Sequence, residues 1–105
     1  MPDYQANGRT YIVDEDGFLQ DAELWSEEVA MDFAVSENLT SLSDEHWKLI
    51  RYIREYYDKF GIAPMVRKLC RDTGLALARI YELFPSGPAK GACKVAGLPK
   101  PAGCV

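Results

Sequence analysis

The stretch that decides the fold is SDEHWKLIRYIREYYDKFG, residues 43–61. Ser43 is a favoured helix N-cap, the acids at 44 and 45 suit the positive end of the helix dipole, and Gly61 is a typical helix stop. Large apolar residues recur at intervals of three, three, four and three, the spacing of one helical face: Trp47, Ile50, Ile53, Tyr57 and Phe60. The sequence therefore predicts a long helix whose apolar face lies in the core.

Downstream of this helix the sequence predicts a helix-turn-helix. Pro64 suits a first helical position, a helix follows over 65–73, Gly74 interrupts it, and a second helix follows over 75–84. Cys70 lies four residues before the glycine, a spacing that lets two helices cross closely. We expect Cys70 to be a small buried residue of this pair and not a reactive thiol.

A DNA-binding regulator is the alternative function that this motif raises. Arg67, Lys68 and Arg71 are placed to touch phosphates, but the second helix offers only Arg79 as a basic reader of base edges, beside Glu82. The chain is also acidic, whereas nucleic-acid binders carry a strongly basic face. We therefore expect the motif to be architectural and DNA not to be a partner.

Upstream of the central helix the sequence predicts a short β-hairpin and one more helix. Residues 9–13 are β-branched and aromatic, Asp16-Gly17 is a tight-turn signal, and apolar Phe18-Leu19 follows. Ser26 is placed to cap a helix with two acids in its first turn, which fades around Asn38. The expected fold is mainly α: a small orthogonal helical bundle containing a helix-turn-helix, with a short N-terminal β-hairpin and a flexible C-terminal arm.

Composition indicates one domain over residues 1–105, with 48% apolar residues and a net charge of −4. The charge is uneven, at −9 over residues 1–60 and +5 over residues 61–105. Either the acidic surface only keeps the protein in solution, or the basic third docks on an acidic or anion-binding partner. We see no membrane-spanning stretch and no signal peptide, so the expected location is the cytoplasm, where thiols are kept reduced.

The last residues, 85–105, have the composition of an arm attached to a folded body of residues 1–84. They read PSGPAKGACKVAGLPKPAGCV, with four prolines, four glycines, three lysines and two cysteines. Pro and Gly at this density disfavour a regular helix, and the stretch has few large apolar residues with which to build a core. We therefore predict a mobile arm that carries two thiols.

Three kinds of chemistry are open to the cysteines of this arm. A Cys93–Cys104 disulfide could act as a structural staple, although that is unusual in the cytoplasm. A zinc ion could bind Cys70, Cys93, Cys104 and His46, although paired C-x₂₋₄-C spacing is missing. His46 could also act on its own as an acid or base, but the sequence shows no nucleophilic partner for it. The third and favoured hypothesis is a redox or sulfur-handling pair of thiols.

The charges near the two cysteines favour different roles for them. Lys90 and Lys94 lie close to Cys93 in sequence and should favour its thiolate, whereas Cys104 has Lys100 four residues back but a terminal carboxylate beside it. Fully extended, the arm reaches roughly 60 Å, far enough to enter another protein's active site. Cys104 is therefore the candidate for the group that is inserted, and Cys93 is the candidate resolving thiol.

The arm with its two preceding residues, LFPSGPAKGACKVAGLPKPAGCV, resembles the DsrC/TusE sulfur-carrier family. The stretches GIAPMV at residues 61–66 and DEDGF at residues 14–18 carry the same resemblance, which covers essentially the whole chain. Members of the TusE type generally have only the penultimate cysteine. The presence of both Cys93 and Cys104 places this sequence with the two-cysteine, DsrC type of the family.

The resemblance implies a mechanism and a set of partners. Cys104 would enter the sirohaem channel of the alpha and beta subunits of dissimilatory sulfite reductase, accept partly reduced sulfur, and form a trisulfide with Cys93. A membrane-bound, heterodisulfide-reductase-like complex would reduce that trisulfide, and sulfur-relay proteins would load the carrier in sulfur oxidisers. The resemblance thus implies a monomeric carrier, not an enzyme, without a cofactor or metal of its own, because sirohaem and iron–sulfur clusters belong to the partners.

Overall fold

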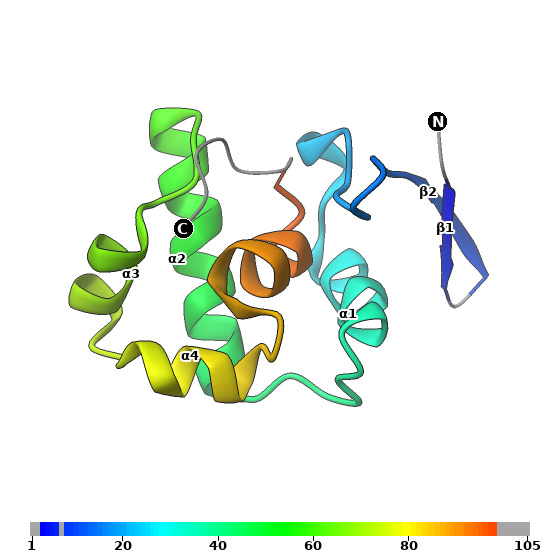
Figure 1. The fold of residues 1–105 in the computed structure, drawn as a ribbon. Coiled ribbons are helices and arrows are strands. Elements are labelled where there is room, and N and C mark those ends of the chain that lie inside the picture. The colour runs from blue at the N-terminus through cyan, green and yellow to red at the C-terminus, as the bar shows by residue number, and fades with distance from the viewer. Residues whose placement is uncertain (1–2, 7, 99–105) are drawn as a thin grey trace.

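The longest helix, α2 (Asp44–Phe60), begins and ends where the sequence predicts. It belongs to a computed structural model that describes residues 3–6 and 8–98. The Ser43 side chain accepts a hydrogen bond from the His46 backbone N–H, and Nδ1 of His46 accepts one from the Ser43 N–H at 2.9 Å. Gly61 ends the helix at φ 74°, in the left-handed region. Figure 1 shows α3 (Val66–Thr73) and α4 (Leu77–Leu83) beside α2, and α1 (Glu27–Ser36) on the far side of the segment drawn in orange.

The apolar face of α2 is buried over its middle turns only. Ile50 and Ile53 are buried as predicted, and Leu49, which the predicted face left out, is buried beside them. Phe60, in contrast, is 55% exposed, so the prediction that it belongs to the core is wrong. The centre of its ring lies 4.6 Å from that of Tyr56 on the same helix.

The N-terminal hairpin forms, but earlier in the chain than predicted. Strand β1 (Asp3–Ala6) pairs antiparallel with β2 (Arg9–Ile12), and Ala6 lies opposite Arg9. Around the predicted turn at Asp16-Gly17 there is only an isolated bridge between Val13 and Leu19. The turn residues there are instead organised by the Asp14 carboxylate, which accepts hydrogen bonds from two backbone N–H groups.

The hairpin is held against helix α1 (Glu27–Ser36) through Asp32, a buried carboxylate. The Tyr4 hydroxyl donates to the Asp32 backbone carbonyl at 2.7 Å, and the Tyr11 hydroxyl donates to the Asp32 carboxylate. Arg9 Nε donates to the same carboxylate at 2.9 Å. A buried carboxylate is tolerated when it is paired and hydrogen-bonded in this way. An isolated two-stranded ribbon is only marginally stable, so the hairpin depends on these hydrogen bonds to Asp32 for its position against α1.

The predicted helix-turn-helix is present as α3 (Val66–Thr73) and α4 (Leu77–Leu83). Gly74 separates the two helices at φ 75°, as its position predicts. Both helices are shorter than predicted. Cys70 is half-buried and packs against the core cluster, in line with a packing role. Within the described residues 3–6 and 8–98, none of the helices has the length and apolar composition needed to cross a bilayer.

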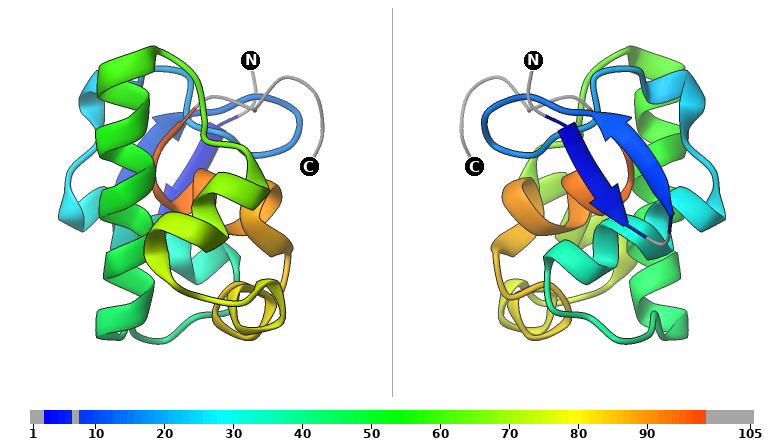
Figure 2. Two further views of the ribbon diagram at one scale, coloured as in Figure 1. Left: turned by 90° about the vertical axis from the view of Figure 1, so that its left-hand side faces the viewer. Right: turned by 90° about the vertical axis from the view of Figure 1, so that its right-hand side faces the viewer.

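The prediction that residues 85–105 form an arm outside the core is wrong for residues 87–98. A π-helical segment, η2 (Pro88–Cys93), follows α4 and continues as a helix to Val95. This segment and the residues after it contribute five residues to the hydrophobic core: Ala92, Cys93, Val95, Ala96 and Leu98. Figures 1 and 2 show this segment, in orange, at the centre of the molecule between α1, α2 and α4. Residues 99–105, which complete the predicted arm, lie outside the described part.

Small residues explain why this Pro- and Gly-rich stretch packs. Pro88 is the first residue of η2. Backbone N–H groups at a helix start have no acceptor within the helix, so the N–H that proline lacks costs no helical hydrogen bond. A Cβ on Gly91 would lie only 2.9 Å from the Cβ of Phe84, so the missing side chain lets the helix approach the end of α4. The short 3₁₀ helix η1 (Ala22–Leu24) lies before Trp25, which covers the far end of the same segment at Gly97.

Candidate functional site

Cys93 is the thiol of the predicted pair that the structure describes, and it is buried. Its exposed fraction is 4%, at the C-terminal end of η2. Burial raises the pKa of the Cys93 thiol from its ordinary 9.0 to about 12. A thiol in this state is protonated at neutral pH and a poor nucleophile. The prediction of an exposed thiolate on a mobile arm is therefore wrong for Cys93.

The sequence predicts that Lys94 favours the thiolate of Cys93, but in the structure Lys94 does not play this role. Its ammonium group Nζ lies 3.6 Å from the carboxylate of Glu37 and 5.5 Å from the centre of the Phe18 ring. Desolvation by burial is the cause of the raised pKa of Cys93. The ammonium group of Lys94 is instead paired with Glu37, at the end of α1. No local pattern in the sequence identifies this partner.

The Glu37–Lys94 ion pair ties the thiol-bearing helix to α1. Glu37 is 7% exposed, and one of its carboxylate oxygens, Oε1, finds no hydrogen-bond partner among the described residues. Such a buried pair adds little net stability, but removing only one partner leaves an uncompensated charge. The pair therefore makes the position of η2 dependent on both residues being present.

The remaining predicted site residues lie outside what the structure describes. Cys104 and Lys100 belong to residues 99–105, and the side chain of Lys90 is likewise not described. The predicted pairing of Cys93 with Cys104, as a disulfide or a trisulfide, therefore stays a prediction. Neither Cys70 nor Cys93 is in a disulfide within the described part of the chain.

His46 is a structural residue, which argues against the zinc hypothesis. It is buried, its Nδ1 accepts a hydrogen bond from the Ser43 N–H, and its Nε2 lies 2.8 Å from the carbonyl oxygen of Leu83. Both ring nitrogens are thus occupied by the cap of α2 and the end of α4. Over residues 3–6 and 8–98, the structure contains no group of three His, Cys, Asp or Glu side chains that could hold a metal.

Three of the four basic side chains of the helix-turn-helix, all except Arg67, are in ion pairs, so the DNA-binding alternative gains no support. Arg79, the expected base reader, pairs with Glu45 and Glu82. Lys68 and Arg71 both pair with Asp72. A recognition helix whose only arginine is held by two carboxylates offers no basic face to a phosphate backbone.

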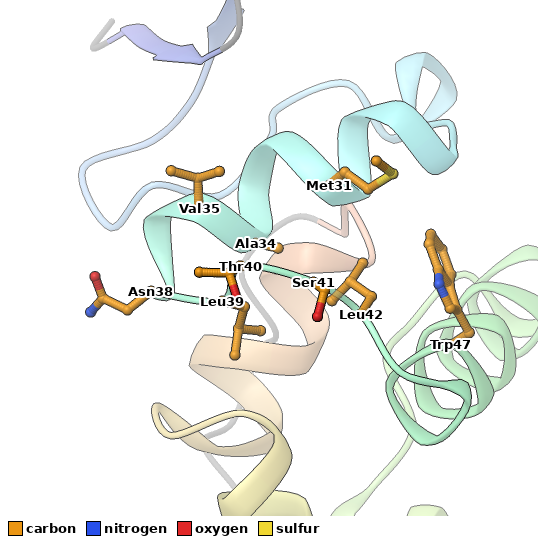
Figure 3. Close-up of a pocket in the computed structure, with 9 residues that line it drawn as sticks. All are labelled: Met31, Ala34, Val35, Asn38, Leu39, Thr40, Ser41, Leu42 and Trp47. Carbon is orange, nitrogen blue, oxygen red and sulfur yellow. The ribbon is translucent and has the colours of Figure 1, made fainter.

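A groove of about 740 Å³ opens beside α1, and it is unrelated to the thiol. Figure 3 shows its lining, which comes from α1, the loop that follows it and Trp47 of α2. The nine lining residues include neither Cys93 nor any titratable side chain. The groove therefore offers no titratable group to the chemistry predicted for Cys93.

Comparisons with known proteins agree on one family. The family model described as "DsrC like protein" matches residues 5–105. The gamma subunit of dissimilatory-type sulfite reductase from Nitratidesulfovibrio vulgaris is 50% identical over 105 residues, covering all of both chains. The sulfurtransferase TusE of Pectobacterium atrosepticum is 38% identical, over 93% of this chain and 95% of that protein.

A solved structure gives the same relationship. The crystal structure of the oxidised gamma subunit of the dissimilatory sulfite reductase (DsrC) from Archaeoglobus fulgidus superimposes with a TM-score of 0.85 at 49% sequence identity. The match covers 99% of this chain and 100% of that one. The helical architecture with its N-terminal hairpin is thus that of an experimentally known fold.

Proposed function

Because the chain belongs to the DsrC-like protein family, we propose that it is a sulfur carrier that accepts sulfur on Cys104 and passes it on through Cys93. The observation that carries this proposal is the match over residues 5–105 to a family whose relatives include both a sulfite reductase gamma subunit and a sulfurtransferase. The chain retains both C-terminal cysteines. We place this chemistry in the cytoplasm, where thiols are kept reduced.

The proposed partner is dissimilatory sulfite reductase, whose alpha and beta subunits supply the redox centres. Sulfur reaches Cys104 as a hydroxylated sulfur atom, Cys–S–S–OH, and the thiol of Cys93 condenses with it. This step releases water and leaves a trisulfide between the two residues. A membrane-bound complex of the heterodisulfide-reductase type then supplies four electrons and four protons, which regenerate two thiols and release hydrogen sulfide. In the oxidative direction, sulfur-relay proteins load Cys104 as a persulfide.

The buried state of Cys93 supports a fixed order of events. With a pKa near 12, Cys93 is protonated and shielded from water, so it does not compete for sulfur or oxidants before Cys104 is loaded. A loaded Cys104 presents its electrophilic sulfur on the same chain, at an effective concentration that no free oxidant reaches. Cys104 therefore acts first and Cys93 second.

The test is intact mass spectrometry of the full chain after incubation with sulfite, the reductase subunits and an electron donor. A persulfide adds about 32 Da and a trisulfide about 30 Da. We expect the trisulfide in the parent protein and no sulfur adduct in Cys104→Ala. Cys93→Ala has no thiol to condense with Cys–S–S–OH, so it should show that hydroxylated species, which adds about 48 Da, or the persulfide formed when the electron donor supplies two electrons and two protons and water is released. Cys70→Ala is the matched control and should behave as the parent does. Normal loading of Cys104→Ala would show that the acceptor is assigned wrongly.

A further inference from the structure

The helical segment η2, which ends at Cys93, is held in the core by small residues. Those of its residues whose burial the structure describes are Pro88, Gly91, Ala92 and Cys93. Apolar contact stabilises in proportion to the area that it removes from water, so these residues contribute less than leucine or phenylalanine would. Helices of the π type are also rare and short, and they occur frequently at functional sites. We therefore expect η2 to have a low local stability for a buried segment.

The residues that follow Cys93 are fixed by two side chains from other elements. The indole N–H of Trp25 donates to the carbonyl of Val95 at 3.0 Å, and Nη1 of Arg54 donates to the carbonyl of Ala96 at 3.3 Å. Carbonyls at a helix C-terminus have no partners within the helix, and these donors satisfy two of them. A local movement that exposes Cys93 therefore has to take place in η2.

The carboxylate of Glu37, at the end of α1, contacts the turn of helix that carries Cys93. Its Oε2 lies 3.6 Å from Nζ of Lys94, and its Oε1 lies 3.3 Å from the position that a Cβ on Gly91 would take. Gly91 and Lys94 are three residues apart, and Cys93 lies between them in the sequence. A movement of η2 away from α1 would therefore separate Glu37 from Lys94.

The Glu37–Lys94 pair is poorly suited to stabilising the fold as a whole. Its distance is longer than a hydrogen bond, and Oε1 of Glu37 has no hydrogen-bond partner among the described residues. Desolvation of the two charges offsets most of their attraction, so a buried pair contributes little net free energy. Such a pair does disfavour an arrangement in which one of the charges stays buried alone. It is therefore suited to fixing one position of η2.

We propose that Glu37 and Lys94 are positioning residues for Cys93, whose ion pair holds η2 in the position that buries the thiol and sets how often η2 opens. This inference rests on the proposed function, in which Cys93 must react although it is buried. In the closed position the thiol is shielded from reagents. In the open position, with the other helices still folded, the thiol is exposed and ionises as an ordinary cysteine does.

The experiment measures the alkylation of Cys93 by iodoacetamide at about pH 8 in increasing concentrations of urea. The full chain carries Cys70→Ala and Cys104→Ala, so that Cys93 is the remaining thiol. Its thiolate displaces iodide and forms a thioether. Reaction through local opening depends little on urea because little surface is exposed, whereas reaction through global unfolding rises steeply with urea. The rate in the urea-independent region therefore reports the opening of η2.

The charge variants should raise this urea-independent rate by different factors. Lys94→Met should raise it about 100-fold, because the Glu37 side chain is only 4% exposed and loses its cation. Glu37→Gln should raise it less, about tenfold, because the Lys94 side chain is 16% exposed and its ammonium group can turn toward water. Lys94→Met/Glu37→Met removes both charges, so its rate should return to within about threefold of that of the parent.

Arg9→Met is the matched control. It removes the cation that lies 2.9 Å from Asp32, a second buried carboxylate, which fixes the hairpin and not η2. The control should lower the urea concentration at which global unfolding begins and leave the urea-independent rate unchanged. A difference between Lys94→Met and Arg9→Met in that region separates positioning of Cys93 from a general loss of stability.

Equal urea-independent rates in Lys94→Met, Glu37→Gln and Arg9→Met would overturn the inference. Absence of a urea-independent region in the parent would overturn it too, because Cys93 would then react only when the whole chain unfolds. If Lys94→Met does not fold, Glu37→Gln and the double variant remain as the test. No sulfur is transferred in this experiment, so the proposed function is judged separately by its own loading test.

Discussion

Cys93 in the folded protein should react with iodoacetamide far more slowly than the same thiol in an unfolded chain. Alkylation requires the thiolate, and burial raises the pKa of Cys93 from 9.0 to about 12. Each unit of pKa above the working pH lowers the thiolate fraction tenfold. The three-unit difference therefore lowers the rate about 1000-fold at about pH 8, before any steric shielding is counted.

The assay uses Cys70→Ala/Cys104→Ala, in which Cys93 is the remaining thiol, and follows alkylation by intact mass. In native buffer the logarithm of the rate should rise by about one per pH unit up to about pH 11 without a plateau. The same protein in concentrated urea is the matched control, and its rate should level off near pH 9.

Two results would refute this reasoning. A plateau near pH 9 in native buffer would mean that the Cys93 thiol is solvated in the folded protein. A native rate within about tenfold of the rate in urea would mean that the helix opens so readily that burial does not protect the thiol. Either result would also remove the physical basis for the order in which we propose that Cys104 and Cys93 act.

Three further predictions concern stability. Gly97→Ala should lower the free energy of unfolding by about 2–4 kcal/mol in urea titrations, because the new Cβ is strained by the left-handed backbone and also displaces Trp25. Gly61→Ala is the matched control: its backbone is also left-handed, but no atom lies within 4 Å of the new Cβ, so it should cost only about 1–2 kcal/mol. Lys94→Met should lower the free energy of unfolding by about 3 kcal/mol, because it leaves the buried Glu37 carboxylate unpaired. Adding Glu37→Met should recover most of that free energy, and a larger loss in the double variant would contradict this account. The pKa of Cys93 is higher in the folded than in the unfolded chain, so the stability that the neutral thiol contributes is present below about pH 9 and is lost as the pH rises toward 12. The free energy of unfolding should therefore depend differently on alkaline pH in the parent and in Cys93→Ala. Parallel pH curves would contradict that.

Helix ends were predictable because their signals are local. The N-cap residues Ser26 and Ser43 and the stop residues Gly61 and Gly74 all lie where the structure places a helix boundary. Each works through bonds to groups within a few residues, so the sequence neighbours are the structural neighbours. The hairpin lies earlier than predicted because Asn7-Gly8 and Asp16-Gly17 are both tight-turn signals, and the local sequence does not rank one above the other.

Composition alone mispredicts the C-terminal stretch, because glycine is typical of mobile segments as well as of sites where the backbone packs closely. Gly91 and Gly97 are sites of close packing against Phe84 and Trp25, and both of those contacts are invisible to a local pattern. A clearer signal was the run of small and apolar residues 92–96, interrupted by a single lysine, which suits a helix in a crowded core. The lysine itself, Lys94, found a partner on α1.

By itself the sequence determined the mainly helical architecture, the family, and the presence of two cysteines near the C-terminus, because periodicity, capping and motif identity are properties of the chain. Only the tertiary structure decided that Cys93 is a buried, protonated thiol in a helix held by Trp25, Arg54 and Glu37–Lys94. The physical reason is that the pKa of a thiol follows the removal of water and the position of charges. Both are set here by residues far away in the chain.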